Sequence, residues 1–175
     1  MISLHADSLV KLLNQVSTRL NVPLEMAEVG VAAGDTSVRL FAEFPNLTMW
    51  LVDPYEDYQR TRASEMRPLL VTLVVNTQPY RDRRKLLIIP SPAAAELVPD
   101  NSLDLVFLDG NHTYDGVKAD LLGWWPKLKS TGSIMCGDDY RPKHAGVIKA
   151  VDEWAEENHH QLEFLPTNVW WTAKA

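Results

Sequence analysis

Three aspartates and a histidine follow two apolar segments of the chain, where each segment ends. The run 103–108 stops at Asp109, with His112 three residues later, and the run 133–137 stops at Asp138 and Asp139. Both runs have the composition of buried parallel strands, and open α/β sheets bind ligands at the carboxyl ends of such strands. We therefore expect these four side chains to lie together at one rim of a sheet.

These residue types suit the activation of a hydroxyl group. An alcohol is a poor nucleophile near neutral pH, and a divalent cation both stabilises its alkoxide and orients it. Asp109, Asp138 and Asp139 offer the hard oxygen ligands that Mg²⁺ or Mn²⁺ prefer. His112 has an ordinary pKa of about 6.5 and is the candidate base. The alternative is structural: the aspartates would cap turns, and His112 would be an ordinary loop histidine.

A second candidate site follows the first predicted strand. Residues 24–29 run into a turn that contains Glu28, Gly30 and Gly34, and glycines let a backbone approach a ligand closely. Their spacing differs from the G-x-G-x-x-G pattern of dinucleotide-binding folds, and no phosphate-binding loop motif is present. Asp53 ends the next strand, where an acid can accept both hydroxyls of a ribose. A tight turn capped by Asp53 is the structural alternative.

The elements that must position these residues alternate between strand and helix. Apolar runs predict strands over 24–29, 48–52, 86–89, 103–108 and 133–137, and a closing hairpin of 161–165 with 169–174. Apolar periodicity predicts helices over 4–20, from 35 onward, and over 61–77, 92–97, 114–128 and 144–159. Residues 69–75 could form a strand on composition, but a strand there would break the alternation. The pattern predicts an α/β, doubly wound, mostly parallel sheet of about seven strands with an antiparallel C-terminal hairpin.

Composition narrows the class of protein. A chain of 175 residues is expected to form a single domain over 1–175, with an N-terminal helix within 1–22 and a core over 24–174. A net charge of −6 lacks the basic footprint of a nucleic-acid-binding protein. The single cysteine, Cys136, fits a reducing compartment. No signal pattern or membrane-spanning run of about 20 apolar residues is visible, so we expect a cytoplasmic location without membrane contact.

Four motifs, in this order, resemble those of the class I S-adenosylmethionine-dependent methyltransferases. They are Glu28-x-Gly30-x-x-x-Gly34, Leu51-Val-Asp53-Pro54, the segment 102–114 around Asp109-Gly-Asn-His112, and Gly137-Asp-Asp-Tyr140. The subgroup that looks most similar is that of the small metal-dependent O-methyltransferases, which includes macrocin-type sugar enzymes. The resemblance covers about residues 24–174 and implies a Rossmann-like fold.

The resemblance also implies a cofactor and its contacts. S-adenosyl-L-methionine would be the methyl donor, with Mg²⁺ (or Mn²⁺) held by Asp109, Asp138 and Asp139. The implied cofactor-binding residues are Glu28, Gly30, Gly34, Thr36, Asp53, Ser91 and Asp109. Among these, Gly30 and Gly34 would flank the methionine part, Asp53 would bind the ribose, and Ser91 would lie on the ribose–adenine side. His112 matches the base of the sugar-methylating relatives. Pro90 and Asn111 depart from the family pattern.

We therefore expect an enzyme that transfers a methyl group to a hydroxyl of a small molecule, a sugar or a phenol. Two alternatives stay open: a metal-independent N- or O-methyltransferase, and a non-catalytic S-adenosylmethionine-binding subunit. A NAD-dependent oxidoreductase is disfavoured by the glycine spacing. Because only one helix precedes the first strand, whereas many relatives carry a larger N-terminal cap, the site is expected to be either open or covered by a second subunit, and a homodimer is our hypothesis.

Overall fold

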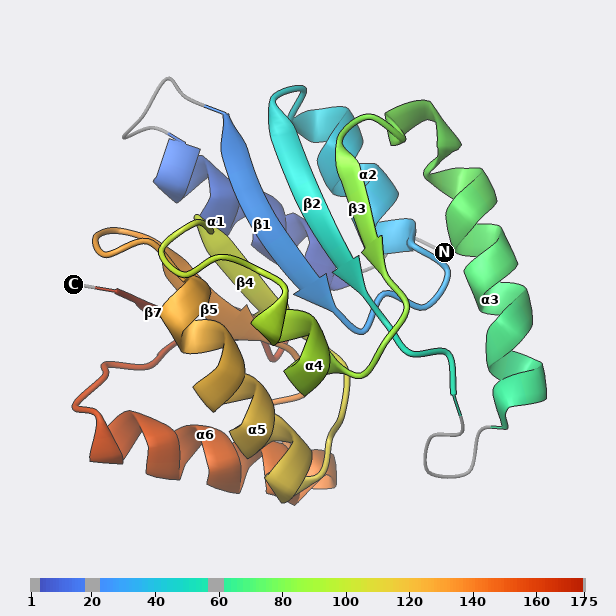
Figure 1. The fold of residues 1–175 in the computed structure, drawn as a ribbon. Helices are drawn as coiled ribbons and strands as arrows, with labels where there is room; N and C mark the ends of the chain where they lie inside the picture. Colours follow the sequence, from blue (N-terminus) through green and yellow to red (C-terminus); the bar gives the residue numbers. More distant parts are fainter. Residues whose placement is uncertain (1–3, 18–22, 57–61, 175) are drawn as a thin grey trace.

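The computed structural model describes residues 4–17, 23–56 and 62–174, and within them the chain forms a seven-stranded sheet in the order β3-β2-β1-β4-β5-β7-β6 (Figure 1). The strands are β1 (Leu24–Val29), β2 (Leu47–Val52), β3 (Arg84–Leu87), β4 (Leu105–Leu108), β5 (Ile134–Gly137), β6 (Glu163–Phe164) and β7 (Trp170–Ala173). The pairs among β1 to β5 are parallel, while β7 runs antiparallel to β5 and β6. The predicted fold class is confirmed.

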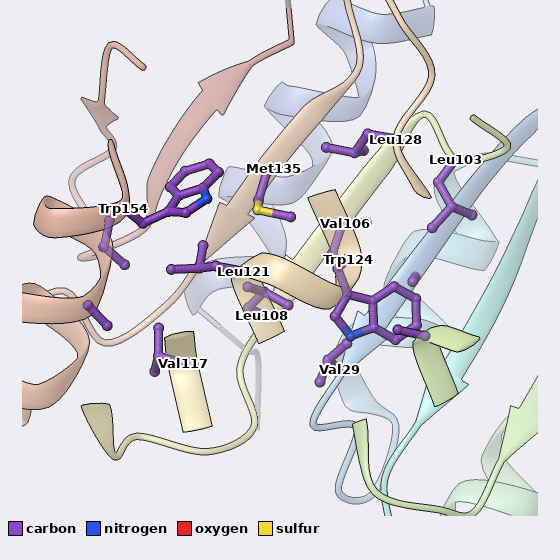
Figure 2. Close-up of a cluster of buried hydrophobic side chains, with 14 of the residues drawn as sticks. Val29, Leu103, Val106, Leu108, Val117, Leu121, Trp124, Leu128, Met135 and Trp154 are labelled. Carbon is purple, nitrogen blue, oxygen red and sulfur yellow. The ribbon is translucent and has the colours of Figure 1, made fainter. Parts of the chain in front are cut away.

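Helices cover both faces of this sheet. They are α1 (Leu4–Ser17), α2 (Asp35–Glu43), α3 (Ala63–Asn76), α4 (Ser91–Glu96), α5 (Tyr114–Trp124) and α6 (Ala145–Glu157), with 3₁₀ turns η1 (Gln78–Tyr80), η2 (Trp125–Lys127) and η3 (Pro142–His144). Side chains alternate across a strand, so each strand serves two cores. Val106 packs with α4, α5 and α6, whereas its neighbour Phe107 packs with α1, α2 and α3. Figure 2 shows the first core, in which Trp124 lies beside Val106 and Val29.

Several predicted boundaries move. The helix preferred over a strand near 61–77 is confirmed as α3. The third strand begins two residues earlier than predicted, because the charged Arg84 and Lys85 are tolerated on the half-exposed edge strand β3. The predicted helix over 114–128 ends at Trp124, since Pro126 cannot continue it. Residues 18–20 of the first predicted helix and the predicted start at residue 61 lie outside the described part of the chain.

The sheet brings the candidate residues to one edge. Val29 is in register with Val52 on one side and Leu108 on the other, and Leu108 is in register with Gly137. The next residue of each strand is therefore Gly30, Asp53, Asp109 or Asp138, at the shared carboxyl edge. None of the helices among the described residues combines the length and apolar character needed to cross a membrane.

Candidate active site

A cavity of about 450 Å³ opens at the carboxyl edge of β1, β2 and β4. Its walls include five of the residues singled out from the sequence: Gly30, Asp53, Ser91, Asp109 and His112. A much smaller cavity adjoins it and is lined by Asp109, His112 and Asp138 among others. The cavity is large enough for a nucleoside-sized ligand and spans from the glycine turn to the carboxylate rim.

Gly30 is required where β1 ends. Its φ is 88°, and a Cβ there would lie 2.1 Å from the carbonyl oxygen of Asp109. Only glycine lets the ends of β1 and β4 approach this closely. Gly34 has a φ of 81° and precedes α2, and a Cβ there would lie 2.5 Å from Leu73 of α3. Gly34 therefore packs two helices together and is not part of the cavity wall among the described residues.

Asp53 holds the turn after β1. Its Oδ2 accepts hydrogen bonds from the backbone N–H groups of Val31 and Ala32, at 3.1 Å each, and its Oδ1 accepts one from Tyr55 at 3.0 Å. A carboxylate has about four acceptor directions, so these bonds leave one for a ligand hydroxyl. The side chain thus has the structural role considered from the sequence, and it also lines the cavity.

Glu28 lies beneath the turn and is almost completely buried, with 2% of its surface exposed. Burial raises the pKa of this carboxyl to about 8, although the hydrogen bond that Ser37 Oγ donates at 2.6 Å opposes the rise. The group is therefore predominantly a neutral acid at pH 7. A cationic ligand bound above it would favour its ionised form.

His5 of α1 reaches the carboxylate rim. Its Nδ1 lies 3.0 Å from Asp138 Oδ2, its Nε2 lies 2.8 Å from Thr36 Oγ1, and Nε2 is also 3.9 Å from Asp109 Oδ2. Burial opposes the charging of this imidazole, but the hydrogen bond with Asp138 and the charges of Asp109 and Asp138 together raise its pKa. Burial raises the pKa of Asp109. Among the described residues, His5, Asp109 and Asp138 form one compact donor group.

His112 and Asp139 form the other half of the rim. His112 Nε2 lies 2.8 Å from Asp139 Oδ2 and 3.9 Å from Asp109 Oδ1. The hydrogen bond with Asp109 and the charge of Asp139 raise the pKa of His112 against the opposing effect of burial. Asp139 has a φ of 60°, and its Oδ1 pairs with Arg141 and lies 3.6 Å from His144 Nε2.

Ser91 belongs to a buried network on the far side of the cavity. Its Oγ donates to Asp120 Oδ1 at 2.5 Å and accepts from Trp124 Nε1 at 2.8 Å. Burial raises the pKa of Asp120 to about 6, and Asp120 also lines the cavity. Asn111 lines the cavity as well, and its Oδ1 accepts from the backbone of Thr113, which shapes the loop before α5.

The predicted residues are thus brought to one edge, but the three aspartates divide between two groups of donor residues. Asp109 and Asp138 group with His5, while Asp139 groups with His112 and His144. The sequence reading missed His5, His144 and Asp120. The sequence could have indicated His5, because it lies on the same apolar face of its helix as Leu9, and a histidine is unexpected on such a face. His144 lies five residues after Asp139 and gives no such signal.

Comparison with known proteins agrees with this architecture. A family model described as a methyltransferase domain matches residues 27–140, more than half of the chain. The uncharacterized protein y4gI of Sinorhizobium fredii is 28% identical over 126 residues, which are 72% of this chain and 12% of that protein, so the chain spans about an eighth of this relative's length.

Two solved structures share the fold across nearly the whole chain. The O-methyltransferase NovP superposes with a TM-score of 0.73 at 16% identity, covering 98% of this chain and 79% of NovP. CalS11, a TDP-rhamnose 3'-O-methyltransferase of calicheamicin biosynthesis, gives 0.70 at 20% identity, covering 98% and 81%. At these identities the two structures establish the fold alone. Because the family model covers most of the chain, the protein belongs to this family of class I S-adenosylmethionine-dependent methyltransferases.

Proposed function

We propose that the protein transfers the methyl group of S-adenosylmethionine to a hydroxyl group of a small molecule, a sugar or a phenol, with the assistance of a divalent cation. The observation that carries this proposal is the position of His112, a base in the wall of the large cavity beside a rim of aspartates. The O-methyltransferases NovP and CalS11 share the fold and support a hydroxyl acceptor.

His112 would accept the proton of the acceptor hydroxyl. Asp139, 2.8 Å away, orients the imidazole and favours its protonated form, as the carboxylate partner of a catalytic histidine does. The hydroxyl oxygen then attacks the methyl carbon, and the bond from that carbon to the sulfonium sulfur breaks. The electron pair of the broken bond stays on sulfur, which becomes a neutral thioether. This displacement needs alignment of donor and acceptor more than covalent assistance.

The cavity wall would supply that alignment. We propose that Gly30 and Asp109 face the methionine part of the cofactor, with Gly34, Thr36 and the buried Glu28 supporting the turn behind it. Asp53 has one acceptor direction left for a ribose hydroxyl, and Ser91 lies on the same wall.

The rim also suits a divalent cation. The donor atoms of His5, Asp109 and Asp138 lie within 4.8 Å of one another, and the buried carboxyl of Asp109 has a raised pKa that a cation would relieve. Asp109 and Asp138 would hold the ion, and Asp139 would join them through the oxygen that now faces Arg141, while its other oxygen stays beside His112. When bound, Mg²⁺ or Mn²⁺ would stabilise the developing alkoxide.

Incubation of the protein with S-adenosylmethionine and panels of sugars, catechols and phenols, followed by mass spectrometry, tests the reaction. We expect a methylated hydroxyl product, with the rate lost in EDTA and restored by Mg²⁺. Asp138→Ala should lose at least about tenfold in rate, as expected for the loss of a ligand to a catalytic ion. Asp100→Ala, an exposed residue paired with Lys127, is the matched control.

Three results, obtained with a panel of amines added, separate this proposal from its alternatives. Full activity in EDTA and in Asp138→Ala would leave a metal-independent transferase, and methylation of amines alone would refute the hydroxyl acceptor. Cofactor binding without transfer to any member of the panels would favour a non-catalytic binding subunit.

We also propose a homodimer, which a monomeric mass by light scattering at micromolar concentration would exclude.

A further inference from the structure

A second donor group shares Asp139 with the proposed magnesium site and has a different chemical character. His112 comes from the loop between β4 and α5, Asp139 follows β5, and His144 ends η3 before α6. Their ligating atoms all lie within 4.8 Å of one another, and the three side chains come from segments held by the same sheet edge. The group therefore contains two imidazoles and one carboxylate, whereas its neighbour at His5 contains one imidazole and two carboxylates.

The measured separations fit one small ion. A tetrahedral zinc site, with Zn–N and Zn–O bonds near 2.0–2.1 Å, places its ligand atoms about 3.3 Å apart. His112 Nε2 lies 2.8 Å from Asp139 Oδ2, and His144 Nε2 lies 3.6 Å from Asp139 Oδ1. These separations lie on either side of the required value. The two separations use different oxygens of Asp139, and one donor atom from each of the three residues lies within 4.8 Å of the other two, so contractions of up to about 1.5 Å would gather all three around one ion.

Burial and backbone conformation hold the central ligand in place. The side chain of Asp139 is only 9% exposed, while those of His112 and His144 are 23% and 17% exposed. Asp139 also has a φ of 60°, a conformation that aspartate tolerates better than most residues and that places its carboxylate between the two rings. Asp139 is therefore an already positioned ligand, and because His112 Nε2 and Asp139 Oδ1 are themselves buried, an ion would reach them when the exposed Arg141 side chain moves away.

Arg141 is the cation that such an ion must displace. Its guanidinium pairs with Asp139 Oδ1, but the side chain is 43% exposed. Asp139 is buried, so removing the guanidinium without a replacement would leave an uncompensated charge, but the incoming ion takes its place beside the carboxylate. The exchange therefore replaces one cation by another with a higher charge, and the guanidinium is released to solvent.

We propose that His112, Asp139 and His144 bind a transition-metal ion of the zinc type, and that this ion inhibits the methyl transfer. Imidazole nitrogens favour Zn²⁺ and its neighbours over Mg²⁺, which prefers oxygen ligands. The inhibition rests on the proposed function: because Nε2 faces Asp139, the hydroxyl proton would go to Nδ1, and an ion on Nε2 keeps the single ring proton on Nδ1, which then has no lone pair to accept another. The binding itself depends only on the three side chains.

Cobalt substitution tests the binding directly. Titration of the full chain with Co²⁺, followed by visible absorption, should show one ion in a low-coordinate nitrogen and oxygen environment. Zn²⁺ should displace that ion, and a large excess of Mg²⁺ should not. His144→Ala should weaken Co²⁺ binding by at least about tenfold, while His159→Ala, an exposed histidine outside the group, should leave it unchanged.

Three results would overturn the proposal: no saturable Co²⁺ signal, displacement of Co²⁺ by Mg²⁺, or binding that survives His144→Ala and is lost in His5→Ala. The last result would place the ion at His5, Asp109 and Asp138. Circular dichroism and a thermal melt of each variant exclude unfolding as the cause of lost binding, and His112→Asn provides a second removal of one ligand. Since the experiment measures ion binding, the absence of methyl transfer would refute the proposed function but would not contradict the binding of the ion by these three side chains.

Discussion

Replacing Glu28 by glutamine should make the protein less sensitive to alkaline pH. The carboxyl is buried with a pKa of about 8, against an ordinary value of 4.5. Between these two pH values the native state holds a proton that the unfolded state has released, so native stability falls as the pH rises. Above about pH 8 the native protein must either ionise this buried group or unfold. Glutamine has no proton to lose and has nearly the same shape.

The magnitude follows from the two pKa values. At 1.36 kcal/mol per pKa unit, the stability that wild type loses through Glu28 grows by about 4 kcal/mol between pH 5 and pH 9. All other titrating groups are common to both proteins, so they cancel in the difference between variant and wild type. The free energy of unfolding of Glu28→Gln should therefore rise by about 4 kcal/mol relative to that of wild type between pH 5 and pH 9, whatever the difference between the two proteins at pH 5.

Urea unfolding at several pH values, followed by tryptophan fluorescence, measures this difference, because Trp124 and Trp170 are buried. Glu96→Gln, an exposed glutamate at the end of α4, is the control and should run parallel to wild type. If the Glu28→Gln and wild-type curves also ran parallel to within about 1 kcal/mol, Glu28 would be ionised in the native protein, and the argument from burial would be wrong.

Two further predictions concern the rim and the turn. Hydrogen bonding to Asp109 and the charge of Asp139 raise the pKa of His112, so kcat/KM should fall as the pH drops through a value above 6.5. The His112→Asn variant should lack this acidic limb of the pH profile. If the limb persisted in the variant, another group would be responsible for it. Gly30→Ala should destabilise the fold by more than about 3 kcal/mol, because its Cβ would meet the Asp109 carbonyl oxygen. The control is Gly132→Ala, where φ is 75° and only the backbone strain of about 1–3 kcal/mol is expected. Equal melting temperatures for the two variants would contradict the close approach of β1 and β4.

The sheet could be predicted from the sequence because its strands are short apolar runs that end in polar residues. Residues 103–108 and 133–137 showed both features, and they contain the buried strands β4, which begins two residues later than predicted, and β5, which begins one residue later. The edge strand β3 was predicted to begin two residues too late. Its residues are only partly buried, so charged side chains occur in the strand and its apolar pattern is less clear. The helix α3 was the difficult case. Its continuous apolar composition does not identify a helix, and the alternation of elements along the chain decided the assignment.

The site was predicted less completely, for a physical reason. The carboxyl ends of parallel strands lie at one edge of the sheet regardless of the loop conformations, so the positions of Asp109 and Asp138 could be predicted from the topology. His5 meets Asp138 across 133 positions of sequence, a contact that depends on how α1 lies against the sheet. The division of the three aspartates between His5 and His112 likewise depends on side-chain directions that residue spacing does not encode.

The contact between His5 and Asp138 also has a consequence for the order of events during synthesis. At about 5–20 residues per second on the ribosome, 133 positions correspond to a delay on the order of ten seconds between the emergence of the two residues. During that interval α1 carries Leu9, Leu12 and Leu13 without the β4 and β5 residues that later cover them. The nascent chain can therefore pack α1 against α2 and the first two strands, but the part of this core contributed by β4 and β5 is missing for seconds. The acidic rim forms only afterwards, so cofactor binding can report on complete folding but cannot guide its early steps.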